Sequence, residues 1–142
     1  MSLKNFEIAR KEVSYRGQAL QVRGFSLNDI SMCMRDYLPE LAKLFDMYSV
    51  EEQRDNALQE SAKFAITIVR ESPLLVARMI TMAADDDSDE SFDIALKLPI
   101  TFQVEVLRVV FELTFEEAGG AKKFIDSLVA TVQAQAPKPK QG

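Results

Sequence analysis

The segment of residues 13–30, VSYRGQALQVRGFSLNDI, constrains the fold more than any other part of the chain. Apolar and polar residues alternate on both sides of Arg16-Gly17, which is the pattern of two strands joined by a tight turn. Ser26 and Asp29 then have the spacing of a capping box at the start of a helix. The segment therefore predicts a β-hairpin over about residues 11–23 that leads directly into helical structure.

The first helix shows apolar residues three and four positions apart, which is the spacing of one buried face. Pro39 interrupts this pattern, and a proline inside a helix removes one backbone hydrogen bond. Two interpretations follow: one kinked helix from Leu27 to Tyr48, or two helices that meet near Leu38. In both cases the same face packs on the core. Its residues are Ile30, Cys33, Met34, Tyr37, Leu38, Leu41, Leu44, Phe45 and Tyr48.

The rest of the chain is also predicted to be helical, so the fold class is mainly α: a compact helical bundle with a short N-terminal β-hairpin and a flexible C-terminal tail. Residues 1–133 form one domain, with the helical body at about 26–133. Residues 134–142, AQAPKPKQG, lack an apolar anchor and should form the tail. The further helices are expected at Ser49 to about Arg70, Leu74 to Ala84 after an N-cap at Ser72, Ser91 to Leu98, Pro99 to Phe115 and about Ala121 to Gln133.

The helix from Pro99 to Phe115 carries apolar residues on two sides. One stripe is Ile100, Val104, Leu107, Phe111 and Phe115, and the other is Phe102, Val106, Val109, Val110 and Leu113. Leaving the second stripe in water would forgo about 1.5–3 kcal/mol for each large side chain. The helix is therefore either central in the fold or covered by another subunit, and we favour the central position because a chain of 142 residues can surround one helix.

Composition excludes most catalytic classes, and we expect no enzyme activity and no cofactor. The chain has no histidine and a single cysteine, Cys33, so it lacks a Ser-His or Cys-His pair and a thiolate zinc site. Its glycines form no phosphate-binding motif. The acidic run Asp85–Glu90 resembles a calcium loop only at first, because Glu90 stands where glycine is needed and Leu96 where a bidentate glutamate is needed. We interpret this run as a solvated loop that starts the next helix.

Charge and hydropathy limit the partners. The net charge of −5 disfavours nucleic acid as a partner, because phosphate binding depends on clustered cations. No apolar run approaches the roughly 18 residues that span a bilayer, so we expect no membrane partner. The N-terminus lacks a signal-peptide core and the lone cysteine fits a reducing compartment, which together predict a cytoplasmic protein.

A binding protein of this kind needs adaptable apolar surface, and methionine is the side chain that adapts best to different partners. We therefore take the methionines outside the first apolar stripe and the second stripe of the Pro99–Phe115 helix as candidates for partner binding or self-association. Ordinary core packing is the competing explanation for each of them. The candidates are Met32, Met47, Met79, Met82, Phe102, Val106, Val109 and Leu113.

Residues 20–48 also carry a resemblance to a known family. Residues 22–29 read VRGFSLND, and residues 41–46 read LAKLFD after an amphipathic helix. The chain resembles the tail assembly chaperones of long-tailed bacteriophages, in which a short N-terminal hairpin ends in a segment of the form v-R-G-l-s-l-n-D and a helix with an l-x-x-l-F-d stretch follows. The resemblance extends to the layout of the whole chain, with a helical bundle and a loose C-terminal tail.

The resemblance implies a non-enzymatic function. Such proteins bind the long, largely helical tape measure protein, keep it soluble and promote tail tube assembly in the host cell cytoplasm, and they are not retained in the mature virion. Many are also made in a longer form by a programmed ribosomal frameshift, and the longer form is thought to contact the tail tube protein. The Pro-Lys repeat at residues 137–140 suits such a frameshift. Homo-oligomers are expected too, because coating a long partner requires many copies. The alternative is a small helical interaction or regulatory adaptor with another partner.

Overall fold

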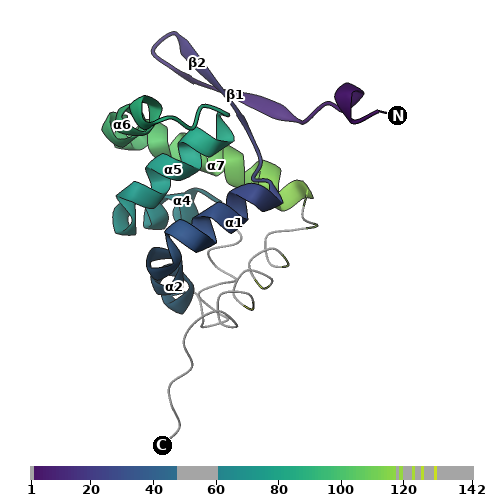
Figure 1. The fold of residues 1–142 in the computed structure, drawn as a ribbon. Helices are drawn as coiled ribbons and strands as arrows, with labels where there is room; N and C mark the ends of the chain where they lie inside the picture. Colours follow the sequence, from purple (N-terminus) through teal and green to yellow (C-terminus); the bar gives the residue numbers. More distant parts are fainter. Residues whose placement is uncertain are drawn as a thin grey trace, which may run out of the picture.

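The computed structural model describes residues 2–47 and 61–117, together with the single positions 119, 123, 126 and 130. Its mainly helical architecture with a short N-terminal hairpin confirms the predicted fold class (Figure 1). The predicted segments 48–60 and 131–142, and most of the predicted last helix, lie outside the described residues. The described elements are η1 (Leu3–Asn5), β1 (Arg10–Tyr15), β2 (Gln18–Arg23), α1 (Leu27–Asp36), α2 (Leu38–Met47), α4 (Ser61–Glu71), α5 (Pro73–Ala83), α6 (Asp89–Lys97) and α7 (Ile100–Glu117).

The hairpin has the register and turn that the sequence predicts. β1 and β2 pair antiparallel with Tyr15 opposite Gln18, so only Arg16 and Gly17 lie in the turn. Both turn residues have positive φ, 49° and 79°, as a type I′ hairpin turn requires. One face of the hairpin packs on the helices, because Val13 is 3% exposed and Val22 is fully buried. The hairpin contacts α5 and α7 and lies at one end of the helical body (Figure 1).

The first predicted helix is divided in two. α1 ends at Asp36 and α2 begins at Leu38, with Tyr37 between them at φ −130° and ψ 28°, outside helical geometry. Pro39 is the second residue of α2, a position where its missing N–H has no helical partner to lose. The two-helix interpretation is therefore confirmed. Both helices still place the predicted face inward, because Cys33, Met34 and Leu41 are buried while Ile30, Tyr37 and Leu38 pack against the core.

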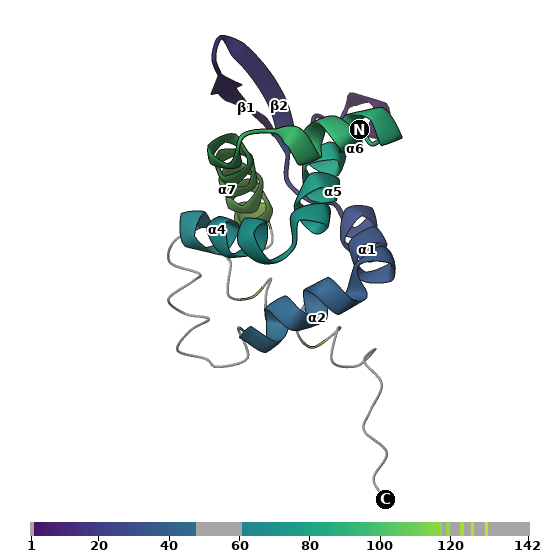
Figure 2. The same ribbon diagram turned by 90° about the vertical axis from the view of Figure 1, so that its left-hand side faces the viewer.

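Helix α7 is central, as we favoured. It contacts α4, α5 and both strands of the hairpin, and Figure 2 shows α4, α5 and α7 beside one another with α1 and α2 to one side. Both predicted stripes are largely buried within the single chain: Val106, Leu107 and Val110 have no exposed surface. The exception is Ile100, at the start of the helix, which is 67% exposed. Covering by another subunit is therefore not needed to explain the two apolar stripes.

The connecting helices differ from prediction mainly at their ends. α5 begins at Pro73 and α6 at Asp89, two residues before the predicted Ser91. Ser72 occupies the N-cap position of α5 as predicted, and its side chain makes no capping hydrogen bond. Ala65 and Ile68 of α4 are buried in the core. Within the described ranges, no helix combines the length and apolar character needed to cross a membrane.

Candidate functional site

The guanidinium group of Arg23 joins three parts of the fold. Its Nη1 atom lies 2.5 Å from Asp29 Oδ2 in α1, and its Nε atom donates to Asp85 Oδ1 at 3.0 Å, in the loop after α5. Nη1 and Nη2 also donate to the carbonyl oxygens of Gly24 and Met82, each at 3.0 Å. The Arg23 side chain is only 12% exposed. The hydrogen bond to Asp29 raises the pKa of Arg23, and the hydrogen bond from Arg23 lowers the pKa of Asp85.

The next residue, Gly24, lets the chain lie directly against α7. A Cβ atom at Gly24 would lie 3.0 Å from the backbone nitrogen of Thr114, which is too close for an unstrained contact. The backbone N–H of Phe25 donates to Thr114 Oγ1 at 2.9 Å, and the Phe25 ring meets the Phe111 ring edge-on at 6.1 Å. Together with the capping box of Ser26 and Asp29, which is present as predicted, these contacts fix the hairpin on α1 and α7.

The acidic run Asp85–Glu90 is exposed as expected, but two of its carboxylates are paired. Asp85 has φ 54° and is held by Arg10 as well as by Arg23. Asp87 forms an ion pair with Arg78 of α5, whose guanidinium lies 5.0 Å from the centre of the Phe92 ring in α6. These ion pairs thus hold the loop between α5 and α6 against β1, β2 and α5. Within the described chain, no three acidic, cysteine or histidine side chains form a group that could hold a metal ion.

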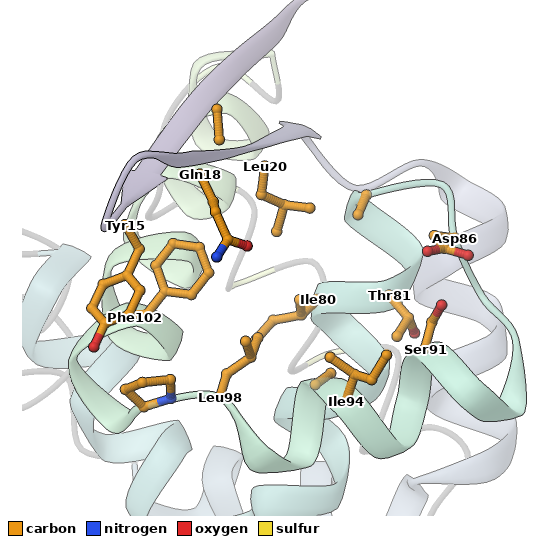
Figure 3. Close-up of a pocket in the computed structure, with 14 residues that line it drawn as sticks. Tyr15, Gln18, Leu20, Ile80, Thr81, Asp86, Ser91, Ile94, Leu98 and Phe102 are labelled. Carbon is orange, nitrogen blue, oxygen red and sulfur yellow. The ribbon is translucent and has the colours of Figure 1, made fainter.

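An open apolar groove lies between the hairpin and helices α5, α6 and α7 (Figure 3). Its volume is about 380 Å³, within the range of roughly 300–1,000 Å³ typical of ligand sites. Most lining side chains are apolar, and Asp86 is the one charged residue among them. The lining residues are Tyr15, Gln18, Ala19, Leu20, Ile80, Thr81, Ala84, Asp86, Ser91, Ile94, Ala95, Leu98, Pro99 and Phe102.

The groove arises where the hairpin lies over the helices, because small side chains line its helical side. Ala84 at the end of α5 and Ala95 in α6 line it, and neither side chain is large enough to fill the space beside the hairpin. The end near the hairpin turn is formed by Tyr15 and Phe102, whose ring centres are 5.3 Å apart. This arrangement can bind apolar side chains of a partner, because the groove is open and most of its lining side chains are apolar.

A buried hydrogen bond holds the base of the groove in place. Gln103 is 7% exposed, and its Nε2 atom donates to the carbonyl oxygen of Ala95 at 2.8 Å. The bond joins the end of α6 to the start of α7 across Leu98 and Pro99. Ile94 lies one residue earlier on α6 and is 56% exposed at the groove. The groove is therefore preformed in the folded chain, with an apolar side chain accessible on its wall.

Comparison with known proteins identifies the family. The family model described as pre-tape measure protein matches residues 1–141. The chain belongs to the pre-tape measure protein family. No curated protein and no solved structure matches it.

The predicted binding residues of this pre-tape measure protein are mostly inside the fold. Six of the eight are between 0% and 8% exposed and pack in the core, which is the competing explanation given above: Met79, Met82, Phe102, Val106, Val109 and Leu113. Met32 is partly buried against the core, and the side chain of Met47 lies outside the described part. The expected exposed surface is thus absent for those six, because α7 and α5 are enclosed by the hairpin and the other helices. Their role in partner binding stays a prediction, and Phe102 alone among the eight lines the groove.

Sequence reasoning missed the groove itself and the role of Arg23. A signal for the groove was present in Ile94, an isoleucine outside the inward face that Phe92 and Ala95 form on α6. For Arg23, the sequence signal was that neither a β-strand nor a helix cap requires an arginine at this position. The elements that form the groove are distant from one another in sequence, and so are Asp85 and Met82 from Arg23. The local pattern could therefore not identify them.

Proposed function

We propose that this pre-tape measure protein is a non-enzymatic tail assembly chaperone that binds the tape measure protein, keeps it soluble and promotes tail tube assembly. The observation that carries the proposal is the family match over residues 1–141, since the family description names a protein of the tape measure system. The preformed apolar groove supports it, because a binding protein without catalytic groups needs such a surface.

The groove has the character of a site for an amphipathic helix. Such helices bind by placing apolar side chains three and four residues apart into a hydrophobic groove. The wall side chain Ile94 and the floor side chains Leu98 and Phe102 are apolar, while Asp86 lies at the polar end near Ser91 (Figure 3). The net charge of −5 keeps the unoccupied protein soluble. An amphipathic partner with a basic residue beside its apolar stripe fits this distribution best.

Co-expression with the tape measure protein tests the proposal. Tagged wild-type protein should copurify the tape measure protein and increase its soluble fraction. Ile94→Asp should reduce both several-fold, because it places a charge on the groove wall. Ile66→Asp on α4 is the matched control, since Ile66 is 50% exposed against 56% for Ile94 and does not line the groove. A tape measure protein that stays insoluble and is not captured by the wild-type chain would overturn the proposal.

The same proposal includes the protein's location and its longer form. We place the protein in the host cell cytoplasm and outside the mature virion, so mass spectrometry of purified virions should detect no peptide from it. A frameshift near residues 137–140 requires a slippery heptamer and an overlapping reading frame in the coding DNA. If both are present, the longer product should copurify with the tail tube protein.

A further inference from the structure

An N-terminal arm, residues 2–9, leaves three large apolar side chains in solvent. Leu3 is 90% exposed, Phe6 is 65% exposed and Ile8 is 54% exposed. Single exposed apolar residues are ordinary, but three within six positions of a projecting segment mark a contact surface. Figure 1 shows the arm extending from the start of β1 away from the helices. The chain's own fold therefore does not cover this surface.

The apolar groove described above is the complementary feature of the same chain. It is open, and Ile94 on its wall remains 56% exposed. The backbone at Phe6 is extended, with φ −79° and ψ 122°. In extended chain, residues two apart lie on the same side, so Phe6 and Ile8 can enter one groove together.

Charge supports the same pairing. The arm carries two charged residues, Lys4 and Glu7. Glu7 stands between Phe6 and Ile8, so in extended chain it lies on the side opposite to them. Lys4 makes no ion pair with the described residues. Asp86 lies at one end of the groove, and Asp89 and Glu90 follow at the start of α6. Within the described part of the chain these three carboxylates also form no ion pair, unlike Asp85 and Asp87. A lysine beside two apolar side chains therefore matches an apolar groove with an acidic end.

We propose that the arm of one copy binds in the groove of a second copy, so that the protein self-associates head to tail through Leu3, Phe6 and Ile8 when no other partner fills the groove. The two sides of this contact are different surfaces, so each added copy retains one free arm and one free groove. An arm of eight residues makes a small interface, well under the roughly 1,200 Å² of stable complexes. The association is therefore concentration-dependent and reversible. This inference goes beyond the proposed function, because it needs only the chain itself.

Analytical ultracentrifugation of the purified full-length chain tests the pairing. The wild-type protein should have an average mass that rises with concentration above the monomer mass of 16.0 kDa. The double variant Leu3→Ser/Phe6→Ser and the groove variant Ile94→Asp should each weaken association by roughly tenfold or more. Ile66→Asp should associate like the wild type. Gln18→Lys, on the hairpin side of the groove, provides a second groove variant in case Ile94→Asp does not fold.

Mixing the variants separates this geometry from its alternatives. An arm-defective copy keeps its groove and a groove-defective copy keeps its arm, so the mixture should form a 1:1 heterodimer and stop there. The chain has no tryptophan, so Phe6→Trp gives a single fluorescence reporter on the arm. Its emission should shift to the blue as concentration rises, and Ile94→Asp should abolish the shift.

Three results would overturn the proposal. A wild-type protein that stays monomeric at all accessible concentrations would do so. So would a blue shift of the Phe6→Trp emission that is independent of concentration, because the arm would then occupy its own groove. Association that persists in both variants would place the interface elsewhere. None of these results bears on tape measure binding, so the proposed function can fail or hold independently.

Discussion

Two glycines near the hairpin are needed for different physical reasons. Gly17 has φ +79°, and a Cβ atom there would have no neighbour within 4 Å, so its requirement is conformational. Gly24 is needed for space, because a Cβ atom would meet the backbone of Thr114 in α7. Backbone in a packed helix cannot move aside as a flexible side chain can. The chain after β2 can thus lie close to α7 only because residue 24 has a hydrogen atom where alanine would have a methyl group.

Substitutions at these glycines should separate the two requirements. Gly17→Asn should cost less than about 1 kcal/mol, because asparagine tolerates the left-handed conformation. Gly24→Ala should cost about 1–3 kcal/mol and Gly24→Asn more, through overpacking against α7. Urea unfolding curves measure both. Stability of Gly24→Ala within about 0.5 kcal/mol of the wild type would show that α7 can move away.

The ion pairs of Asp85 predict a pH dependence. Arg23, and then Arg10, lower the pKa of Asp85 in the folded state. Its contribution to stability is therefore fully present above the unfolded pKa of about 3.9 and is lost as pH falls through the lower folded pKa. Because the Asp85 side chain is 43% exposed, we expect Asp85→Asn to cost only about 0.2–1 kcal/mol at pH 7.

The measurement is the free energy of unfolding of wild type and Asp85→Asn across the acid range. The difference between them should shrink toward zero at the acid end. Asp86→Asn is the control, since Asp86 forms no ion pair within the described chain. A difference that grows on acidification would contradict the sign of the Asp85 effect.

At the scale of elements, helix starts that look alike in sequence are not equivalent in structure. Ser26 accepts from the backbone N–H of Asp29, and Ser88 accepts from the N–H of Ser91. Ser72 precedes α5 in the same way, but its Oγ atom is buried and has no hydrogen-bond partner. Here Pro73 and the packing of α5 in the core define the helix start without a side-chain cap.

Alanine substitution should expose this difference. Ser26→Ala should lower the free energy of unfolding by about 1 kcal/mol, because it removes one side of the capping box. Ser72→Ala should be neutral or stabilising by up to about 1 kcal/mol, because it removes an unpartnered buried hydroxyl. Thermal and urea unfolding compare the two. Equal losses in both variants would mean that Ser72 forms a cap in solution.

At the scale of the whole molecule, one groove serves both proposed contacts. If the arm of a second copy and the tape measure protein bind the same groove, the two must compete by mass action. Self-association then covers the apolar surface while the partner is absent. It also gives way once a partner with more apolar side chains is present.

Removal of the arm's apolar side chains should therefore strengthen partner binding at high protein concentration. The Leu3→Ser/Phe6→Ser variant should bind a soluble tape measure fragment more tightly than the wild type where the wild type self-associates. The advantage should disappear on dilution. A titration followed by fluorescence or calorimetry at two protein concentrations provides the measurement. Weaker binding by the variant at every concentration would instead place the arm in the partner-binding surface.

Local sequence patterns were sufficient to predict the elements that depend on residues a few positions apart. The alternation around Arg16-Gly17, the spacing of Ser26 and Asp29, and the apolar steps along residues 30–48 each depend on neighbours within a few positions. They predicted the hairpin, the cap and the buried face of α1 and α2. The same kind of pattern left the effect of Pro39 open, because a proline is compatible with a kink or with a new helix start.

The sequence by itself predicted the hairpin, the helices of the described residues and the resemblance to the phage family that the family match confirms. Only the tertiary structure decided which apolar residues are core and where an open surface remains. Met82, Val106 and Leu113 are not exposed, because helices distant in sequence enclose them. Arg23 gained its role because Asp85, 62 positions away in sequence, lies beside it in the fold. Burial depends on which elements meet, and periodicity in one helix carries no information about its neighbours.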